Sequence, residues 1–226
     1  MQPTDKNYTG GEPLPLSFYG MSALEVAPLL LGQTLVRHTE QGDISCRIIE
    51  TESYGGVGDK GSHAFGGRRT ARTEVMFHEG GLAYIYLIYG MYNCLNVVTG
   101  PSGDPQAVLI RAVEPLTDND EMLMRMNRDI HIRKPADLSG GPGKLCRALR
   151  IDKSLNGSTL YEQGCHLWIE AGQHPDNNSS IVQAPRINID YAEEYASKPW
   201  RFYYRDHPYV SVVDKKATAW SLPTSR

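Results

Sequence analysis

The stretch YIYLIYGMYNCLN, residues 84–96, places four of the chain's thirteen tyrosines within thirteen positions. Aromatic and apolar residues alternate on both sides of a Gly-Met step, and this pattern predicts two antiparallel strands joined by a tight turn. Tyr84 and Tyr86 share one face of the first strand, because successive strand side chains point to opposite faces. Tyr89 and Tyr92 lie beside the turn, where side chains project outward. Core packing does not explain exposed rings at a turn, so they are candidates for stacking on a nucleobase.

The sequence on both sides of this hairpin predicts further strands and helices. Strands are predicted by period-two alternation over residues 34–39, 43–54 and 106–115, and more briefly over 166–171, 181–187, 201–205 and 209–213. Helices are predicted over residues 21–33, 118–128 and 191–197, and from Lys144 onwards. In the first of these helices, Ser22 and Glu25 have the spacing of a capping box. The Gly-rich segment 55–82 is too long for an inert connection and is predicted to be a functional loop.

No repeat, low-complexity tract or linker divides the chain into separate units. We therefore predict one α+β domain with a curved, largely antiparallel β-sheet core, flanked by helices and carrying a protruding β-hairpin. The domain is expected to span residues 18–216. Residues 1–17 are expected to form a loose lead-in, and residues 217–226 a C-terminal tail.

The composition is typical of a globular protein, with 226 residues, 40% of them hydrophobic. No stretch approaches eighteen consecutive apolar residues, so no membrane association is predicted. The N-terminus lacks the pattern of a secretory signal, and the four cysteines are dispersed singly, as expected for free thiols in a reducing compartment. We therefore expect a cytoplasmic protein, associated with the nucleoid in a bacterium or nuclear in a eukaryote.

The formal net charge of −3 gives no reason by itself to expect a nucleic-acid partner, but the cations are clustered. One basic segment, residues 67–72, contains Arg68, Arg69 and Arg72 and no acid. The other, residues 144–153, contains Lys144, Arg147, Arg150 and Lys153 against a single Asp152. Such segments are either solvated faces of the molecule or contacts to phosphates.

Glu50 and Glu52 continue the face of an apolar strand that begins with Ile44 and Cys46. An isolated buried carboxylate costs several kcal/mol, so each must be paired, protonated or functional. Side chains two residues apart on a strand are about 6.5–7 Å apart, which would also allow the pair to flank a glycosidic bond. Arg111, inside another apolar strand, needs an acceptor, and either glutamate could form a structural ion pair with it.

The histidines do not show the spacing of a metal site, so no metal and no cofactor are predicted. His63 is distinctive only because it lies in the long loop just before the first basic segment. The segment SGGPGK, residues 139–144, resembles a phosphate loop but has Leu138 where the first Gly should stand. It is either an ordinary helix start or a helix N-terminus whose backbone N–H groups, with Lys144, bind a phosphate.

Six blocks together match a known family: IIETESYGG (48–56), SHAFGGRRTARTEVMF (62–77), LAYIYLIYGMYNCLNVV (82–98), VLIRAVEPL (108–116), LSGGPGKLCRAL (138–149) and KPWRFYYRDHPYVSVV (198–213). In this order they resemble the alkyladenine (3-methyladenine) DNA glycosylases, the mammalian and bacterial type without a helix-hairpin-helix. The resemblance runs from about residue 22 to residue 214. It implies an enzyme that removes alkylated or deaminated purines from duplex DNA by base flipping.

The resemblance also implies roles for particular positions. Glu52 matches the general base that activates the attacking water, and Arg111 the arginine that holds the water and the carboxylate. The base pocket would consist of Tyr54, His63 and Tyr86 as aromatic walls, with Asn96 disfavouring the amine of normal guanine.

Further residues are expected to contact the DNA, some implied by the resemblance and some taken from the two basic segments. Tyr89 matches the wedge that fills the gap left by the base, with Met91 and Tyr92 beside it at the tip of the hairpin. The candidate contacts to the DNA backbone are Arg68, Arg69, Arg72 and Lys144.

The expected reaction is hydrolysis of the N-glycosidic bond without strand cleavage, since nothing matches the amine nucleophile of a bifunctional glycosylase. The substrates would be 3-methyladenine, 7-methylguanine, hypoxanthine and ethenoadenine in double-stranded DNA. The enzyme is expected to act as a monomer and to pass abasic sites to downstream processing enzymes. Two alternatives remain open from the residues alone: a non-catalytic module that stacks bases on tyrosines, and a glycosidase for free nucleosides or sugars that uses Glu50 and Glu52.

Overall fold

The computed structural model describes residues 10–128, 130–172 and 180–221. The strands are β1 (Thr34–Thr39), β2 (Gly42–Tyr54), β3 (Ala83–Ile88), β4 (Tyr92–Thr99), β5 (Gln106–Pro115), β6 (Leu167–Glu170), β7 (Ile181–Ala184), β8 (Arg201–Tyr204) and β9 (Thr218–Ala219). The α-helices are α1 (Leu16–Tyr19), α2 (Ala23–Leu29), α3 (Asp118–Arg128), α4 (Pro135–Ser139) and α5 (Pro142–Ala148). The α+β fold predicted from the sequence is confirmed.

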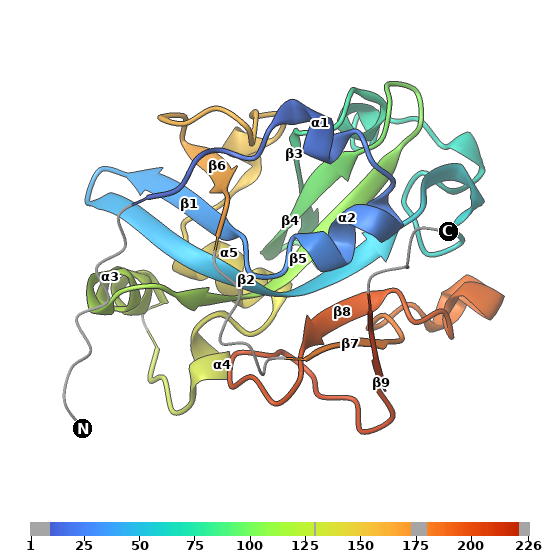
Figure 1. The fold of residues 1–226 in the computed structure, drawn as a ribbon. Coiled ribbons are helices and arrows are strands. Elements are labelled where there is room, and N and C mark those ends of the chain that lie inside the picture. Colours follow the sequence, from blue (N-terminus) through green and yellow to red (C-terminus); the bar gives the residue numbers. More distant parts are fainter. Residues whose placement is uncertain (1–9, 129, 173–179, 222–226) are drawn as a thin grey trace.

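The strands form one open antiparallel sheet in the order β3-β4-β5-β2-β8-β7-β9, and β1 and β6 extend it beside β2. Strand β2 is the longest element and runs through the middle of the molecule (Figure 1). One of its edges pairs with β5, and its other edge pairs first with β1 and then with β8. Strand β2 therefore connects the hairpin side of the sheet to the β7–β8 side.

Helices cover both faces of this sheet: α2 lies in front of β2 and β5, and α5 lies behind them (Figure 1). Helix α2 begins with the predicted capping box, in which the Ser22 side chain accepts from the Glu25 N–H and the Glu25 side chain accepts from the Ser22 N–H. Its core-facing side buries Ala23, Val26 and Ala27. This burial fixes the position of the central strands from which the site is built.

The pairing of β2 with β5 contains two compensating irregularities. Ile48 pairs with Val113 and Glu50 with Ala112, so Ile49 is an extra residue on β2. The register then recovers because Thr51 pairs with Ile110, leaving Arg111 as the extra residue on β5. The strict period of two assumed from the sequence is therefore interrupted at the point where the charged residues begin. Bulges re-aim side chains and are common beside active sites.

Two elements predicted from the sequence are wrong. Residues 209–213 do not form a strand, because their backbone bonds to buried charges: the Ser211 N–H donates to Glu50 and the Val212 carbonyl accepts from Arg201. The predicted helix at 191–197 is a 3₁₀-helix, Asp190–Tyr195, interrupted at Glu193 by a positive φ of 50°. The helix expected from Lys144 begins two residues earlier, at Pro142.

The loop 55–82 contains three 3₁₀ turns, Gly56–Gly58, Phe65–Gly67 and Glu74–Phe77. Within the expected lead-in, Leu14 is buried and helix α1 begins at Leu16; within the expected tail, β9 pairs with β7. Residues 1–9 and 222–226 lie outside the described part of the chain.

All four cysteines are free thiols. None of the helices in the described ranges is both long and apolar enough to cross a bilayer.

Candidate active site

A cavity of about 570 Å³ opens between the hairpin, the end of β2 and the start of α5. This volume lies within the range typical of small-molecule sites. Residues singled out from the sequence that line it are Tyr54, His63, Tyr86, Tyr89, Tyr92, Asn96, Arg111 and Lys144. They come from segments up to 90 residues apart, so the sheet and the loop 55–82 bring together most of the predicted site.

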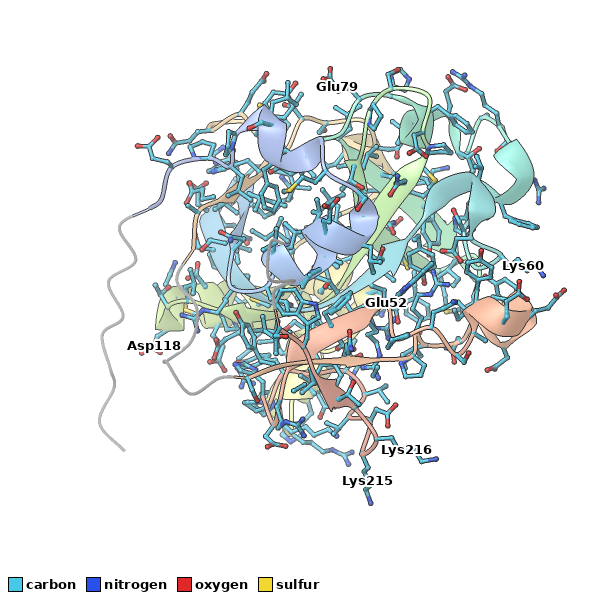
Figure 2. The ribbon with its side chains drawn as sticks, turned by 45° about the vertical axis from the view of Figure 1, so that its right-hand side comes forward. Glu52, Lys60, Glu79, Asp118, Lys215 and Lys216 are labelled. Carbon is cyan, nitrogen blue, oxygen red and sulfur yellow. The ribbon has the colours of Figure 1, made fainter. Side chains whose placement is uncertain are left out.

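Glu52 lies directly behind the wall of this cavity and is fully buried. Figure 2 shows it inside the molecule, whereas Lys60, Lys215 and Lys216 lie at the periphery. Its Oε1 accepts from the backbone N–H of Ile187 at 2.8 Å and lies 3.3 Å from Arg111 Nη1. Its Oε2 accepts from the Tyr54 hydroxyl at 2.9 Å.

Because all three partners of Glu52 line the cavity, the carboxylate is held next to the space where a ligand would bind. It is held there in a fixed orientation.

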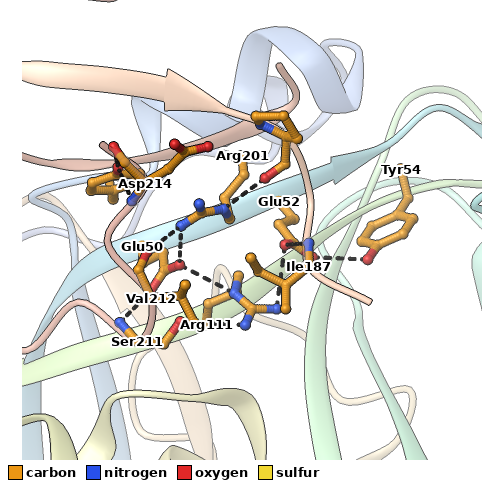
Figure 3. A network of polar contacts seen from close by, with 11 residues as sticks. Glu50, Glu52, Tyr54, Arg111, Ile187, Arg201, Ser211, Val212 and Asp214 are labelled. Carbon is orange, nitrogen blue, oxygen red and sulfur yellow. Dashed lines mark hydrogen bonds and ion pairs between the residues drawn. The ribbon is translucent and has the colours of Figure 1, made fainter. Parts of the chain in front are cut away.

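Glu50 has a different environment from Glu52, although the two are only two residues apart (Figure 3). Its Oε1 lies 3.2 Å from Arg111 Nε and 2.9 Å from Arg201 Nη1, and its Oε2 accepts from the Ser211 N–H at 2.7 Å. Two carboxylates and two guanidinium groups thus form one buried network of balanced charge. Glu50 does not line the cavity and serves to pair buried cations.

Arg111 joins the two halves of this network. It is 7% exposed, and its guanidinium contacts Glu50, Glu52 and the Ser211 hydroxyl. Burial lowers the pKa of Arg111, but the neighbouring Glu52 and Glu50 more than offset this and raise it above its ordinary value. Arg111 therefore stays charged and keeps one face toward the cavity.

One aromatic wall of the cavity is the Tyr54 ring, which is supported from behind. The Arg186 guanidinium lies 4.7 Å from the centre of the Tyr54 ring and 5.0 Å from that of Trp200. Arg186 is itself paired with buried Asp59, with Nη2 2.8 Å from Oδ1, and donates to the Ser53 carbonyl. The ion pair and the two rings fix the plane of Tyr54.

The other wall consists of His63 and Tyr86, whose ring centres are 4.6 Å apart in an edge-to-face arrangement. Arg72 Nη2 donates to His63 Nε2 at 3.1 Å, since a guanidinium can only donate. His63 must then carry its proton on Nδ1 and donate it to the Tyr84 hydroxyl at 2.9 Å. Burial, Arg72 and Arg68 lower the pKa of His63 to about 4. The His63 imidazole is therefore neutral at physiological pH.

Comparison with known proteins shows the family of the chain. The model of the methylpurine-DNA glycosylase family matches residues 17–208. The chain belongs to that family. It is 51% identical over 200 residues to a protein of Bacillus thuringiensis (strain Al Hakam) named "Putative 3-methyladenine DNA glycosylase", covering 87% of this chain and 98% of the relative. Proteins of Bacillus cereus (strain Q1) and Bacillus anthracis (strain CDC 684 / NRRL 3495) with the same name are 51% and 50% identical over the same shares. The chain is thus a DNA N-glycosylase, a hydrolase of DNA repair whose substrate is DNA with damaged bases.

The hairpin tip of the glycosylase presents all three candidate intercalating side chains to solvent, to different extents. Tyr89 is 75% exposed, Met91 58% and Tyr92 37%. The turn consists of residues 89–91, with Tyr89 and Gly90 both at positive φ, so it begins one residue before the predicted Gly-Met step. Tyr92 also packs on the backbone of Gly143, where an added Cβ would stand 2.9 Å from the ring, and under the Arg147 guanidinium at 5.3 Å.

The four cations expected to contact the DNA backbone have different surroundings in the glycosylase. Arg68 is exposed. Arg69 forms a two-bond ion pair with Glu74, at 2.9 and 2.6 Å, and Arg72 is exposed and lies against the Tyr86 ring. Lys144 donates to the Ala136 carbonyl and lines the cavity.

Sequence reasoning did not identify four residues that hold the glycosylase site together: Arg186, Ile187, Arg201 and Ser211. Two of them act through backbone N–H groups, which leave no signal in a sequence. Arg186 and Arg201 lie in or beside short strands that are otherwise mostly apolar. A charged residue in such a strand was the signal that could have identified them as buried, paired side chains. Asn96, by contrast, was identified; its Nδ2 donates to the Tyr84 carbonyl at 3.0 Å, which fixes its amide in the cavity.

Proposed function

We propose that this glycosylase flips alkylated or deaminated purines out of duplex DNA and hydrolyses their N-glycosidic bond with a water activated by Glu52. The observation that carries the proposal is the position of the Glu52 carboxylate, which is fully buried directly behind an aromatic cavity and held by the Tyr54 hydroxyl, the Ile187 N–H and Arg111. The substrates proposed are 3-methyladenine, 7-methylguanine, hypoxanthine and ethenoadenine.

Base selection in this proposal depends on stacking. Methylation at N3 or N7 makes a purine cationic, and a cation is attracted to the faces of electron-rich rings such as Tyr54 and Tyr86. The neutral His63 adds no opposing charge from an imidazolium. Asn96 would disfavour the exocyclic amine of an undamaged guanine.

The chemical step begins with departure of the base, which takes the bonding electron pair and leaves an oxocarbenium-like sugar. A carboxylate at Glu52 stabilises that positive charge. Water then adds to the sugar carbon as Glu52 accepts one of its protons. Glu52 returns this proton to a purine that left as an anion, or releases it to solvent where a cationic purine left neutral, so the products are the free base and an abasic site in an intact strand. Arg111 would orient both the carboxylate and the water.

The extruded conformation costs a few kcal/mol of unstacking, and less where the base pair is already damaged. Tyr89 and Met91 at the hairpin tip are the side chains proposed to occupy the gap in the duplex. Binding by stacking alone, without cleavage, would leave Glu52 only as a structural partner of Arg111. The sugar-glycosidase alternative needs a second free carboxylate, and Glu50 is bonded to Arg111, Arg201 and the Ser211 N–H.

The proposal is tested by incubating the protein with duplex oligonucleotides that each contain one of the four lesions. Release of the free base, with a strand that breaks only on subsequent treatment with hot alkali, would support it. Strand breakage without alkali would exclude the monofunctional reaction, and release from none of the duplexes would exclude the proposed substrates.

A further inference from the structure

The Tyr84 hydroxyl is a buried polar group at the base pocket that has no role in the proposed reaction. Tyr84 is 2% exposed and lines the cavity. It pairs directly with Asn96 across β3 and β4, and the Asn96 amide donates to its backbone carbonyl at 3.0 Å. The position of the Tyr84 ring is therefore set by the sheet.

The hydrogen bonds around His63 decide which group supplies the proton between His63 and Tyr84. Arg72 Nη2 can only donate, so His63 Nε2 accepts from it and His63 Nδ1 carries the imidazole proton. That proton is donated to the Tyr84 hydroxyl oxygen, which lies 2.9 Å away. Tyr84 is the acceptor in this bond, so its own O–H proton remains to be donated.

The Tyr84 hydroxyl keeps this proton, because burial raises its pKa above the ordinary value despite the neighbouring Arg72. Among the described residues, none is seen to accept a hydrogen bond from it. Buried hydroxyl groups are rarely left without a partner. A donor left over on the wall of a cavity therefore favours an acceptor supplied by the molecule that enters the cavity.

We propose that the Tyr84 hydroxyl donates a hydrogen bond to a ring nitrogen or to the carbonyl oxygen of the extruded purine. The inference rests on the proposed function, since the base must occupy this cavity. A neutral lesion such as hypoxanthine develops negative charge as it leaves, and a fixed donor at one of its acceptor atoms stabilises that charge. A purine made cationic by methylation is a poorer acceptor. Tyr84 thus favours the neutral lesions, whereas the faces of the aromatic rings favour the cationic ones.

The test removes one acceptor atom of the base at a time. Duplexes carry hypoxanthine, its 7-deaza or 3-deaza analogue, or unsubstituted purine, which lacks the carbonyl oxygen. Each base is attached to a 2′-fluorinated sugar, because the fluorine opposes an oxocarbenium ion and keeps the base in place.

Binding of these duplexes is measured for the wild type and Tyr84→Phe. Tyr19→Phe is the matched control, because Tyr19 is fully buried and its hydroxyl donates to the Leu160 carbonyl at 3.1 Å, away from the residues that line the cavity. We expect one analogue to bind the wild type and Tyr19→Phe about 10- to 100-fold more weakly than hypoxanthine, the effect of an unsatisfied buried donor. The same analogue should bind Tyr84→Phe as tightly as hypoxanthine does.

The proposal is overturned if every analogue has the same penalty in Tyr84→Phe as in the wild type. It is also overturned if the wild type binds all three analogues as tightly as hypoxanthine, a result that does not depend on the folding of any variant. A wild type that shows the expected pattern but releases no base from ordinary deoxyribose would refute the proposed function and leave the Tyr84 contact standing. Base release with unchanged penalties would refute the Tyr84 contact alone.

Discussion

The guanidinium carbon of Arg72 lies 4.7 Å from the centre of the Tyr86 ring, on the wall of the base pocket. A cation on this ring competes with a cationic base for the same electron-rich system. We predict that Arg72→Gln raises the ratio of kcat/KM for 7-methylguanine over that for hypoxanthine about 2- to 5-fold.

Any loss of general DNA affinity in Arg72→Gln affects both lesions equally and cancels in this ratio. Arg68→Gln is a suitable control, because Arg68 is exposed and is not seen to contact Tyr86. A ratio that falls would contradict the interpretation of Arg72 as a competing cation.

His63 should titrate far below the ordinary range of histidine. Its folded pKa of about 4 lies below the unfolded value of about 6.5. The folded state therefore binds fewer protons between these values, so the stabilisation from neutral His63 is complete above pH 6.5 and is lost as the pH falls toward 4. We predict an NMR titration midpoint of its imidazole near pH 4, moving upward in Arg72→Gln. A wild-type midpoint near 6.5 would show that burial and the neighbouring arginines do not keep His63 neutral in solution.

Replacing Glu50 by its neutral isostere should lower the stability of the fold. In Glu50→Gln, buried Arg201 loses its carboxylate partner, and breaking a buried pair typically costs about 3–5 kcal/mol. We predict a loss of this size in the free energy of unfolding, measured in urea. Glu121→Gln, which removes an i,i+4 pair with Arg125 at the surface, should cost less than about 1 kcal/mol. Equal losses in the two variants would rule out a structural role for Glu50.

Gly143 permits the close packing of Tyr92 on α5. An added Cβ would stand 2.9–3.0 Å from Tyr92 Cδ1, Cβ and Cγ, atoms too near the backbone to move freely. We predict that Gly143→Ala displaces the hairpin, lowers stability by about 1–3 kcal/mol and weakens lesion binding. Gly58→Ala is the control, since its added Cβ meets nothing within 4 Å. Unchanged lesion binding in Gly143→Ala would show that the position of Tyr92 does not matter.

Local sequence signals predicted those elements of the fold whose stability is local. The strand 106–115 and the helix 118–128 were predicted with the observed bounds, and the capping box at Ser22 is present. Residues 209–213 alternate like a strand, but their backbone groups bond to Glu50 and Arg201 across more than 150 and about ten residues respectively. Such long-range competition cannot be read from a local pattern.

The site was partly predictable for a related reason. Aromatic rings at a turn and carboxylates on an apolar strand are visible departures from core packing. They singled out Tyr89 and the pair Glu50 and Glu52, and the resemblance then favoured Glu52. The placement of Arg72 against the Tyr86 ring depends on how the loop 55–82 folds back over the hairpin, and no residue type encodes that. The buried pair of Arg186 with Asp59 is likewise a product of tertiary structure.

The central claim, that Glu52 activates water next to a flipped purine, is tested most directly by single-turnover excision of hypoxanthine from duplex DNA. The wild type is compared with Glu52→Gln, whose folding is checked by thermal unfolding and whose binding to the lesion duplex is measured alongside. We predict that Glu52→Gln binds the duplex but releases base about 100- to 10,000-fold more slowly, the usual contribution of a general base. A folded Glu52→Gln that releases base within 10-fold of the wild-type rate would contradict the account.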